Sequence, residues 1–300
     1  MATQPIDYVV AMVNPSDPLW LRDYQWACRA MRLFDNDKGM TPRFRSWGIE
    51  RYHFRAVAKN LPFVRKFHLL VSRESQVPKW VDPTKVNIVL HSDIMPQSLL
   101  PTFNSSAFEL FINNIPELSE LFLYGNDDML PLSPMRRKEF FKGIKPICRH
   151  FEKPQHQGVF HSTIRNALEL AADFAGVDVP KGVVWTTGHS VYMLRRSVIA
   201  AVWQMYGKRL IDSCTQFRSS RNINGYVWQY VAELCGQTIE GLHEHKYISR
   251  AKPIEDVMEA LAGTGYVCIN DAGDGDFATY RDSVCKALEA KFPEPCKYER

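Results

Sequence analysis

Short runs of residues that are apolar at every position constrain the fold of this chain most strongly. One such run occupies residues 121–124, and two further runs, at residues 67–71 and 86–90, are dense in apolar residues. A strand that is apolar on both faces is buried on both, which is typical of parallel sheets covered by helices. Helical periodicity separates these runs, at residues 20–34 and 50–60. We therefore expect an α/β fold with a mostly parallel sheet flanked by helices.

The second half of the chain has a different pattern. Helical periodicity dominates residues 163–174, 196–206 and 223–235, and a strand at 265–269 precedes a last helix at 277–291. A basic stretch at 135–153, interrupted by prolines, suggests a lid or linker. We expect one domain over residues 1–300, with an α/β half at 1–130. Residues 131–300 form a helical half that completes the active site and returns to the sheet near 265–271.

Composition excludes several classes of protein. Lys and Arg number 37 against 33 Asp and Glu, a net charge of +4, which argues against a dedicated nucleic-acid-binding arm. No stretch approaches the roughly 18 uncharged apolar residues of a membrane-spanning helix. The seven cysteines are dispersed and lack C-x-x-C spacing, so they favour a reducing, cytoplasmic compartment.

Acidic residues follow two of the apolar runs directly. Asn126, Asp127 and Asp128 follow the run at 121–124, and Asn270 with Asp271 ends the run near 265–269. Ligand sites of open α/β sheets lie at the carboxyl ends of strands. Carboxylates there could hold Mg²⁺ or Mn²⁺, because these hard cations favour oxygen ligands. The alternative is an ordinary acidic turn, since Asn and Asp suit turns on backbone grounds alone.

A basic segment provides candidate phosphate ligands. Residues 43–79 include nine Lys or Arg and only two acids. Arginine binds phosphate oxygens bidentately and keeps its charge. Arg51 and Arg55 are four residues apart, so they share one face of the expected helix. Most members of a charged run are solvated, and we expect one to three of them to contact a ligand.

Three further positions have the chemistry of a reactive site. His189 lies at a loop–strand junction, and a histidine pKa suits a general base. Arg218 and Arg221 offer two guanidinium groups near an anion. Glu109 has two interpretations: an active-site carboxylate, or the third helical residue of a capping box that Ser106 opens. For any single histidine, a structural role is the alternative.

Taken together, these motifs resemble the Stealth family of sugar-phosphate transferases, which includes bacterial capsule polymerases and the animal N-acetylglucosamine-1-phosphotransferase of lysosomal targeting. The resemblance covers four blocks, in order, over nearly the whole chain. The first is residues 6–10 with Ser16-Asp17-Pro18, and the second is residues 43–128, which include Phe103-Asn104-Ser105. The third is His189 with Phe217-Arg218-Ser219, and the fourth is Cys268-Ile269-Asn270-Asp271 with the ending Phe292-Pro293-Glu294-Pro295.

The resemblance implies a Rossmann-like or GT-A-like fold and a specific reaction. A hexose-1-phosphate, for example N-acetylglucosamine-1-phosphate, moves from a UDP-type nucleotide sugar to a saccharide hydroxyl, and a nucleoside monophosphate is released. The product is a phosphodiester of a capsule or exopolysaccharide. Residues 1–130 would bind the nucleotide sugar and residues 131–300 the acceptor. No nucleic acid is implied, and membrane or capsule-assembly partners would bind peripherally, at the inner face of the membrane.

The resemblance also implies residue roles. Asp128 and Asp271 hold a divalent metal, and His189, or Asp127 in an alternative assignment, deprotonates the acceptor. Arg218 stabilises the transferred phosphate, and Glu109 is an active-site carboxylate by its position in the family pattern. The residues expected to face the nucleotide are Asn14, Asp17, Arg43 and Arg51.

The sequence departs from the family pattern at two places, which puts the choice of nucleotide or sugar in doubt. Pro15 replaces a glycine in the first block, and Ser46 replaces an acid in the second. Two other functions stay open: a metal-dependent glycosyltransferase that releases a nucleoside diphosphate, and a non-catalytic nucleotide-sugar-binding protein of the same fold.

Overall fold

A five-stranded, mostly parallel sheet forms the centre of the molecule. The computed structural model describes residues 4–33, 44–179, 181–241, 244–249, 253–270 and 277–300. The strand order is β10-β4-β1-β2-β3, and only β10 runs antiparallel to its neighbour. The strands are β1 (Ile6–Ala11), β2 (Val64–Val71), β3 (Val86–Leu90), β4 (Leu121–Asn126) and β10 (Tyr192–Arg195). The predicted α/β class and parallel sheet are therefore confirmed.

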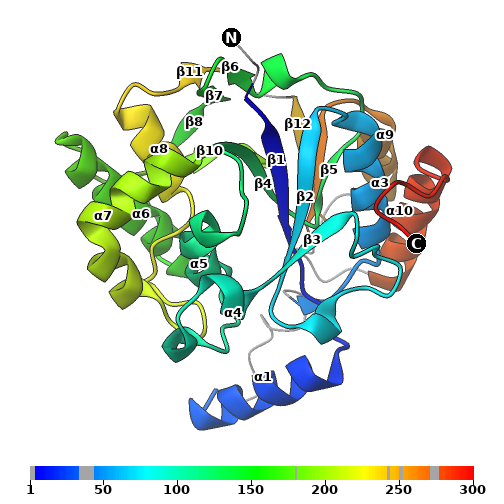
Figure 1. The fold of residues 1–300 in the computed structure, drawn as a ribbon, viewed down its shortest axis with the longest axis horizontal. Coiled ribbons are helices and arrows are strands. Elements are labelled where there is room, and N and C mark those ends of the chain that lie inside the picture. Colours follow the sequence, from blue (N-terminus) through cyan, green and yellow to red (C-terminus); the bar gives the residue numbers. More distant parts are fainter. Residues whose placement is uncertain (1–3, 34–43, 180, 242–243, 250–252, 271–276) are drawn as a thin grey trace.

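Helices cover both faces of this sheet, as Figure 1 shows. One layer is α6 (Val159–Ala175), α7 (Arg196–Ser213) and α8 (Val227–Leu234), and the helices on the other side are α3 (Glu50–Asn60), α9 (Ile254–Ala262) and α10 (Phe277–Lys291). Along β1, Val9 packs with the first layer, whereas Tyr8 and Val10 pack with α3. This alternation explains why the strand is apolar at successive positions: each face buries its own side chains.

A second sheet adjoins the first, with the order β12-β13-β5. These strands are β12 (His245–Ser249), β13 (Tyr266–Asn270) and β5 (Met129–Pro131). β5 follows β4 after a two-residue turn and pairs antiparallel with β13. The return near 265–271 is thus to this second sheet rather than to the central one, with 271 outside the described residues.

Residues 135–154 form strands, so the prediction of a lid or linker there is wrong. The strands are β6 (Phe141–Lys142), β7 (Lys145–Cys148) and β8 (His150–Pro154); β6 and β7 join β11 (Ile239–Glu240), and β8 pairs with β9 (Val183–Thr187). Phe140, Phe141 and Cys148 are buried in the core beside β1 and β2. The burial of these apolar side chains holds the segment in the core, although its prolines and charges had suggested a lid or linker.

Further helices, most of them short, lie in the segments that connect the strands. They are α1 (Pro18–Ala30), α4 (His91–Ile94) and α5 (Ser105–Phe108), with 3₁₀ helices η1 (Glu74–Gln76), η2 (Gln97–Leu99), η3 (Glu109–Asn114) and η4 (Arg137–Glu139). α1 packs through Trp20 and Ala27 against Phe103. This small aromatic cluster ties α1 to the edge of the sheet at which β1 ends.

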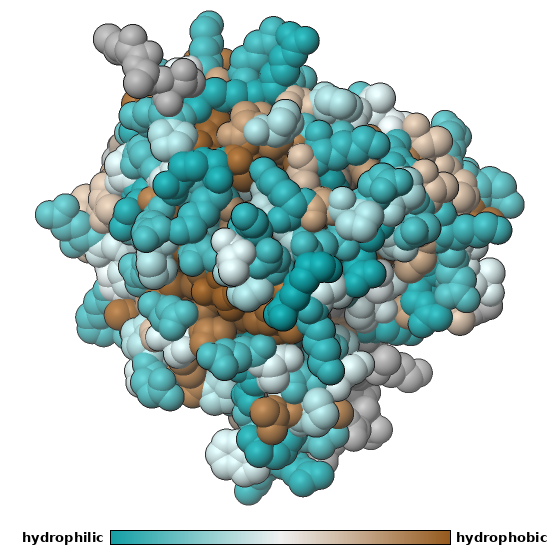
Figure 2. Space-filling view, turned by 45° about the vertical axis from the view of Figure 1, so that its right-hand side comes forward, coloured by the Kyte–Doolittle hydropathy of each residue, from teal (hydrophilic) through white to brown (hydrophobic). Residues whose placement is uncertain are grey.

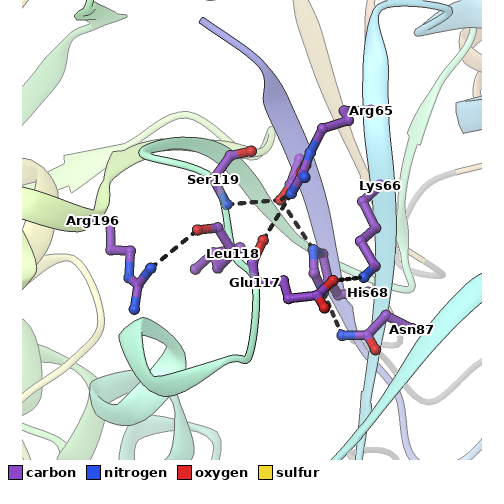
Figure 3. A network of polar contacts seen from close by, with 9 residues as sticks. Arg65, Lys66, His68, Asn87, Glu117, Leu118, Ser119 and Arg196 are labelled. Atoms are coloured by element: carbon purple, nitrogen blue, oxygen red, sulfur yellow. Dashed lines mark hydrogen bonds and ion pairs between the residues drawn. The ribbon is translucent and has the colours of Figure 1, made fainter.

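A buried polar network joins the sheet strands near the start of β1 (Figure 3). The Asp7 carboxylate accepts hydrogen bonds from Arg65 at 2.8 and 2.6 Å and from the Ser119 amide at 2.8 Å. It also contacts His68 at 3.2 Å, and the second ring nitrogen of His68 lies 2.9 Å from Asn87 Nδ2. Burial alone would raise the pKa of Asp7, but the hydrogen bonds from Arg65 and His68 hold that pKa well below its usual value.

The outer surface is largely polar. On the face in Figure 2, hydrophilic side chains predominate and apolar residues gather in hollows between them. Among the described residues, no helix combines the length and apolar character that crossing a membrane requires.

Candidate functional site

The two predicted acidic strand ends meet in the structure. Asp127 and Asp128 form the turn between β4 and β5, and β13 runs beside this turn to its last residue, Asn270. The Ile269 amide donates to the carbonyl oxygen of Asp128 at 2.9 Å. The two strand ends thus lie side by side as far as Asn270, and Asp271 lies outside the described residues.

Two cavities open at this edge and share part of their lining. The first has a volume of about 280 Å³ and lies at the end of β1, next to Trp20, Phe44 and Phe103. The second has a volume of about 220 Å³ and is lined by Glu109 and His189, among others. The residues that line both are Ser105, Asn126, Asp128, Arg218 and Asn270. These five polar residues form a junction that joins the two cavities into one continuous site.

Asp128 at the junction, and Asp127 beside it, lie in an environment that disfavours the charged form of a carboxyl group. Burial raises the pKa of Asp128 to about 6. Burial, followed by the charges of Asp128 and Glu50, raises the pKa of Asp127 well above its usual value. Asp128 Oδ2 accepts a weak bond from Cys268 Sγ at 3.5 Å, and Oδ1 is buried without a hydrogen-bond partner in the described part of the chain. A cation or a hydrogen-bond donor at this point would relieve both conditions.

The donor set suits a hard divalent cation that a ligand helps to bind. Asp127 and Asp128 supply carboxylate oxygens to the first cavity, and Asn126 and Asn270 supply amide oxygens. Within the described ranges, no group of three or more His, Cys, Asp or Glu has the arrangement of a metal cage. This pattern fits magnesium, which is often held by one or two carboxylates together with substrate phosphates.

Glu109 lines the second cavity, and the capping-box interpretation is wrong. Asn104 is the N-cap of α5, where its Oδ1 accepts from the Ser106 amide at 3.1 Å. Glu109 lies at the end of that helix, buried, and accepts from Tyr124 Oη at 3.1 Å. A Cβ atom on Gly225 would lie 2.6 Å from Glu109 Oε2, so a glycine provides the space for this carboxylate.

The pKa of Glu109 is raised, chiefly because the group is buried, while Arg218 and the Tyr124 hydroxyl act in the opposite direction. Perturbed carboxyl groups in cavities are typical of reactive sites. The position of Glu109 in the lining of the second cavity therefore supports a chemical role for this residue.

His189 lies just before β10 and lines the second cavity. Its ring packs on Tyr247, with 4.3 Å between the ring centroids. Partial burial lowers the pKa of His189, and the neighbouring His245 and Lys153 lower it further. The imidazole is consequently neutral at pH 7 and can accept a proton.

Arg218 reaches the junction from the loop between α7 and α8. One of its terminal nitrogens donates to Ser105 Oγ at 2.8 Å. The loop is held by Asn222, a buried residue whose Oδ1 accepts from the Ser219 amide at 2.7 Å and from Asn104 Nδ2 at 2.9 Å. The sequence prediction missed Asn222, because no local pattern identifies an asparagine whose partners come from other elements.

The predicted nucleotide-facing residues Asn14 and Asp17 are engaged in the fold. Asp17 is the N-cap of α1 and accepts from the Leu19 amide at 3.0 Å, Ser75 Oγ at 2.6 Å and Gln76 Nε2 at 2.8 Å. The Asn14 amide donates to Gln76 Oε1 at 2.6 Å. Neither residue lines the two cavities. They shape the loop after β1 instead.

The basic segment also has mainly structural roles. Arg51 and Arg55 form ion pairs with Glu299, at 3.3 and 2.8 Å, and Arg51 lies over the Trp80 ring. The structure thus directs Arg51 to the C-terminal segment rather than to the cavities. Arg43 falls outside the described residues. Arg73 forms an ion pair with Asp23 and also lines a third cavity of about 290 Å³, which shares Trp20 and Phe103, among others, with the first.

Aromatic residues of the site were not predicted. Tyr192 and Tyr226 line the second cavity, and Trp20, Phe44 and Phe103 line the first. Their spacing along the sequence is that of ordinary core residues, so periodicity alone could not separate them from the core.

The fold and the site define an α/β protein with a carboxylate–arginine site at the carboxyl ends of its strands. Residues 43–147 match Stealth protein conserved region 2. The match assigns residues 43–147 to the Stealth family, as the motifs predicted.

Named relatives support this membership. The exopolysaccharide phosphotransferase cps2G of Lactiplantibacillus plantarum is 44% identical over 138 residues, which cover 45% of this chain and 39% of that protein. The capsular polysaccharide phosphotransferase WcwK of Streptococcus pneumoniae is 26% identical over 334 residues, which cover 98% of this chain and 99% of WcwK. The chain thus spans well under half of the first relative and nearly all of the second. The crystal structure of galactosyltransferase LgtC with donor and acceptor sugar analogs aligns over 95% of both chains, with a TM-score of 0.42 and 9% identity.

Proposed function

We propose that this protein is a sugar-phosphate transferase. It would move a hexose-1-phosphate from a UDP-type nucleotide sugar to a hydroxyl of an acceptor sugar, with a nucleoside monophosphate as the second product. The names of cps2G and WcwK, both phosphotransferases of surface polysaccharides, support this reaction and its use in capsule or exopolysaccharide synthesis. The observation that carries the proposal is the pair of cavities that meet at Asp128 and Arg218.

The two cavities have different chemistry, which supports a division between donor and acceptor. The first is lined by aromatic side chains and by Asp127, and it lies beside the cavity that Arg73 lines. These features suit a nucleobase and a diphosphate. The second contains His189 and Glu109, the groups that can accept a proton from a hydroxyl. We therefore assign the nucleotide to the first cavity and the acceptor to the second.

The reaction proceeds at the phosphorus that carries the sugar. The acceptor oxygen forms a bond to this phosphorus while the bond to the bridging oxygen of the nucleotide breaks. His189 takes the proton of the hydroxyl, and the nucleoside monophosphate leaves with the bridging oxygen. Such in-line displacement needs positioning and charge stabilisation above all. Arg218 is suited to stabilise the equatorial phosphate oxygens because its loop brings it to the junction.

His189 is favoured over Asp127 as the base. Asp127 lines the first cavity and is absent from the lining of the second, where the attacking hydroxyl would lie. Burial and the neighbouring charges raise the pKa of Asp127 well above its usual value, and a bound cation would counter this effect by stabilising the charged form. Asp127 is therefore better suited to the metal site.

Asp128 and Asp127, with Asp271 as the residue that the family pattern adds, would hold Mg²⁺ or Mn²⁺. The buried Oδ1 atom of Asp128, which has no partner in the described ranges, supports this assignment. The ion would neutralise charge on the diphosphate as a Lewis acid. The seven free cysteines support a reducing, cytoplasmic location.

Product analysis tests the proposed function. The protein is incubated with a panel of UDP-sugars, a panel of methyl hexopyranosides as acceptors, and Mg²⁺, and the nucleotide products are separated by chromatography. Release of UMP together with a phosphodiester signal in the phosphorus NMR spectrum is the expected result. Release of UDP would identify a glycosyltransferase. Thermal stabilisation by a UDP-sugar without turnover would identify a nucleotide-sugar-binding protein.

A further inference from the structure

An exposed apolar pair lies at the mouth of the second cavity. Val159 and Phe160 begin α6 and keep 44% and 48% of their side-chain surface exposed. Further along the same helix, Ile164, Ala167 and Leu168 are fully buried in the core. Val159 and Phe160 therefore contribute little to the core, and both line the second cavity. Exposure of two large apolar residues at a cavity is a property that ligand binding explains.

The position of the Phe160 ring is set by its neighbours. The ring meets His161 edge to face, with 5.9 Å between centroids and 87° between the planes. His161 Nδ1 in turn accepts a hydrogen bond from the His156 amide at 3.2 Å. These contacts give an exposed aromatic ring a defined orientation at the cavity, which is the requirement for stacking on a ligand.

The other side of the cavity is polar. Its lining includes the side chains of Glu109, Asn126, Asp128, Arg218, Asn224 and Asn270. The volume of about 220 Å³ is below the roughly 300–1,000 Å³ of pockets that enclose a drug-sized ligand. A ligand of matching shape is small, with one apolar face and a rim of hydroxyl groups. A pyranose ring has this shape, because its axial C–H bonds point to a face and its hydroxyls to the rim.

We infer that Phe160, with Val159 beside it, is the stacking wall of an acceptor subsite that binds a single pyranose ring. This inference rests on the proposed function. The C–H face of the acceptor sugar packs on the Phe160 ring, and one of its hydroxyls points toward His189 and the junction. In-line displacement supports this assignment, because the attacking oxygen lies opposite the leaving nucleotide, whereas the donor hexose is an equatorial substituent of the same phosphorus.

Binding of simple glycosides tests the inference without any need for turnover. Saturation-transfer NMR is recorded with a panel of methyl α- and β-hexopyranosides in the presence of UDP and Mg²⁺. The wild type is expected to transfer saturation to the axial C–H protons of at least one glycoside, and Phe160→Ala to lose most of this signal. Phe160→Trp retains it because an aromatic face is kept. Absence of a signal for every glycoside with the wild type would overturn the inference.

Kinetics with the same glycosides separate the acceptor from the donor. Phe160→Ala is expected to raise the acceptor KM about 3- to 10-fold, in line with the loss of one aromatic stacking contact, and to leave the donor KM unchanged. Trp26→Ala is the matched control, since Trp26 is an exposed aromatic residue of α1 that lines neither cavity. A rise in the donor KM with the acceptor KM unchanged would overturn the inference, because it would assign the donor hexose to Phe160. Failure of the proposed function would instead appear as UDP release or no turnover in a protein that still binds glycosides through Phe160.

Discussion

The Nδ2 atom of Asn104 donates to the Oδ1 atom of Asn222 over 2.9 Å, and both side chains are buried. Asn222 Nδ2 donates to the Ser213 carbonyl at 2.6 Å and to Thr215 Oγ1 at 2.7 Å. The buried amide thereby ties the loop that carries Arg218 to the segment that contains Ser105. A site whose charged group lies on a loop depends on such ties, because misplacement by about 1 Å can lower the rate about 100-fold.

We predict that Asn222→Ala lowers kcat about 10- to 100-fold through displacement of Arg218. A double-mutant cycle measures this effect. In an Arg218→Ala background, the same substitution is expected to have little further effect on kcat, because the group that it positions is gone. If Asn222→Ala lowered kcat by the same factor in both backgrounds, the buried amide would act independently of Arg218.

Replacement of Asp128 should separate activity from stability. Asp128→Asn is expected to lower turnover by two or more orders of magnitude, because a carboxylate at the junction is lost. The melting temperature in metal-free buffer should stay equal or rise, because repulsion between adjacent carboxylates in a buried setting is removed. Calorimetry and initial rates measure the two effects, and Asp256→Asn, which changes an exposed acid of α9, serves as the control. A large drop in melting temperature together with the activity loss would indicate a structural role.

The pH dependence of kcat/KM tests the base. A neutral His189 must accept the proton, so activity should fall as the pH drops through its pKa, which partial burial, His245 and Lys153 keep below the usual value of about 6.5. His189→Ala is expected to lower kcat/KM by about 10²- to 10⁴-fold and to remove this acidic limb. Asp127→Asn should keep the limb. Loss of the limb in Asp127→Asn alone would reassign the base.

Stability at acidic pH should depend on the network around Asp7. The pKa of Asp7 is lower in the folded state than in the unfolded chain, so its contribution to stability is complete above the unfolded pKa, near 3.9. It is lost as the pH falls through the lower folded pKa. Asp7→Asn should lower the free energy of unfolding at pH 7 by about 3 kcal/mol, because a buried acceptor of four contacts is lost. Urea unfolding at pH 7 and pH 3 measures both effects. The loss caused by Asp7→Asn should be smaller at pH 3, which lies below the unfolded pKa, and an equal loss at pH 7 and pH 3 would contradict this account.

The apolar runs made the central sheet predictable, because burial on both faces leaves a local mark on the sequence. The acidic strand ends were predictable for the same reason: Asp128 and Asn270 come directly after such runs, and β13 pairs beside the turn that follows β4. The motif of His189 and Arg218 likewise led to residues that share the second cavity.

Other predicted site residues make contacts that the sequence did not indicate, because their partners are distant in the sequence. The Asp17 carboxylate accepts hydrogen bonds from Ser75 and Gln76, and Arg51 forms an ion pair with Glu299. No local sequence pattern indicates these contacts. Glu109 has the spacing of a capping box opened by Ser106, but Asn104, two residues before Ser106, caps the helix. Glu109 is instead buried beside Tyr124. Burial and hydrogen bonding between distant elements decide such cases, and neither can be read from local spacing.

The central claim is that the acceptor hydroxyl attacks the phosphorus that carries the sugar, and an isotope label tests this claim most directly. UDP-N-acetylglucosamine, or the UDP-hexose that the product screen selects, is prepared with ¹⁸O between the anomeric carbon and the phosphorus and is turned over with an accepted glycoside. Attack at phosphorus leaves that oxygen attached to the sugar, so mass spectrometry should find ¹⁸O in the phosphodiester product and unlabelled UMP. Recovery of ¹⁸O in UDP, with an unlabelled glycoside product, would contradict the account.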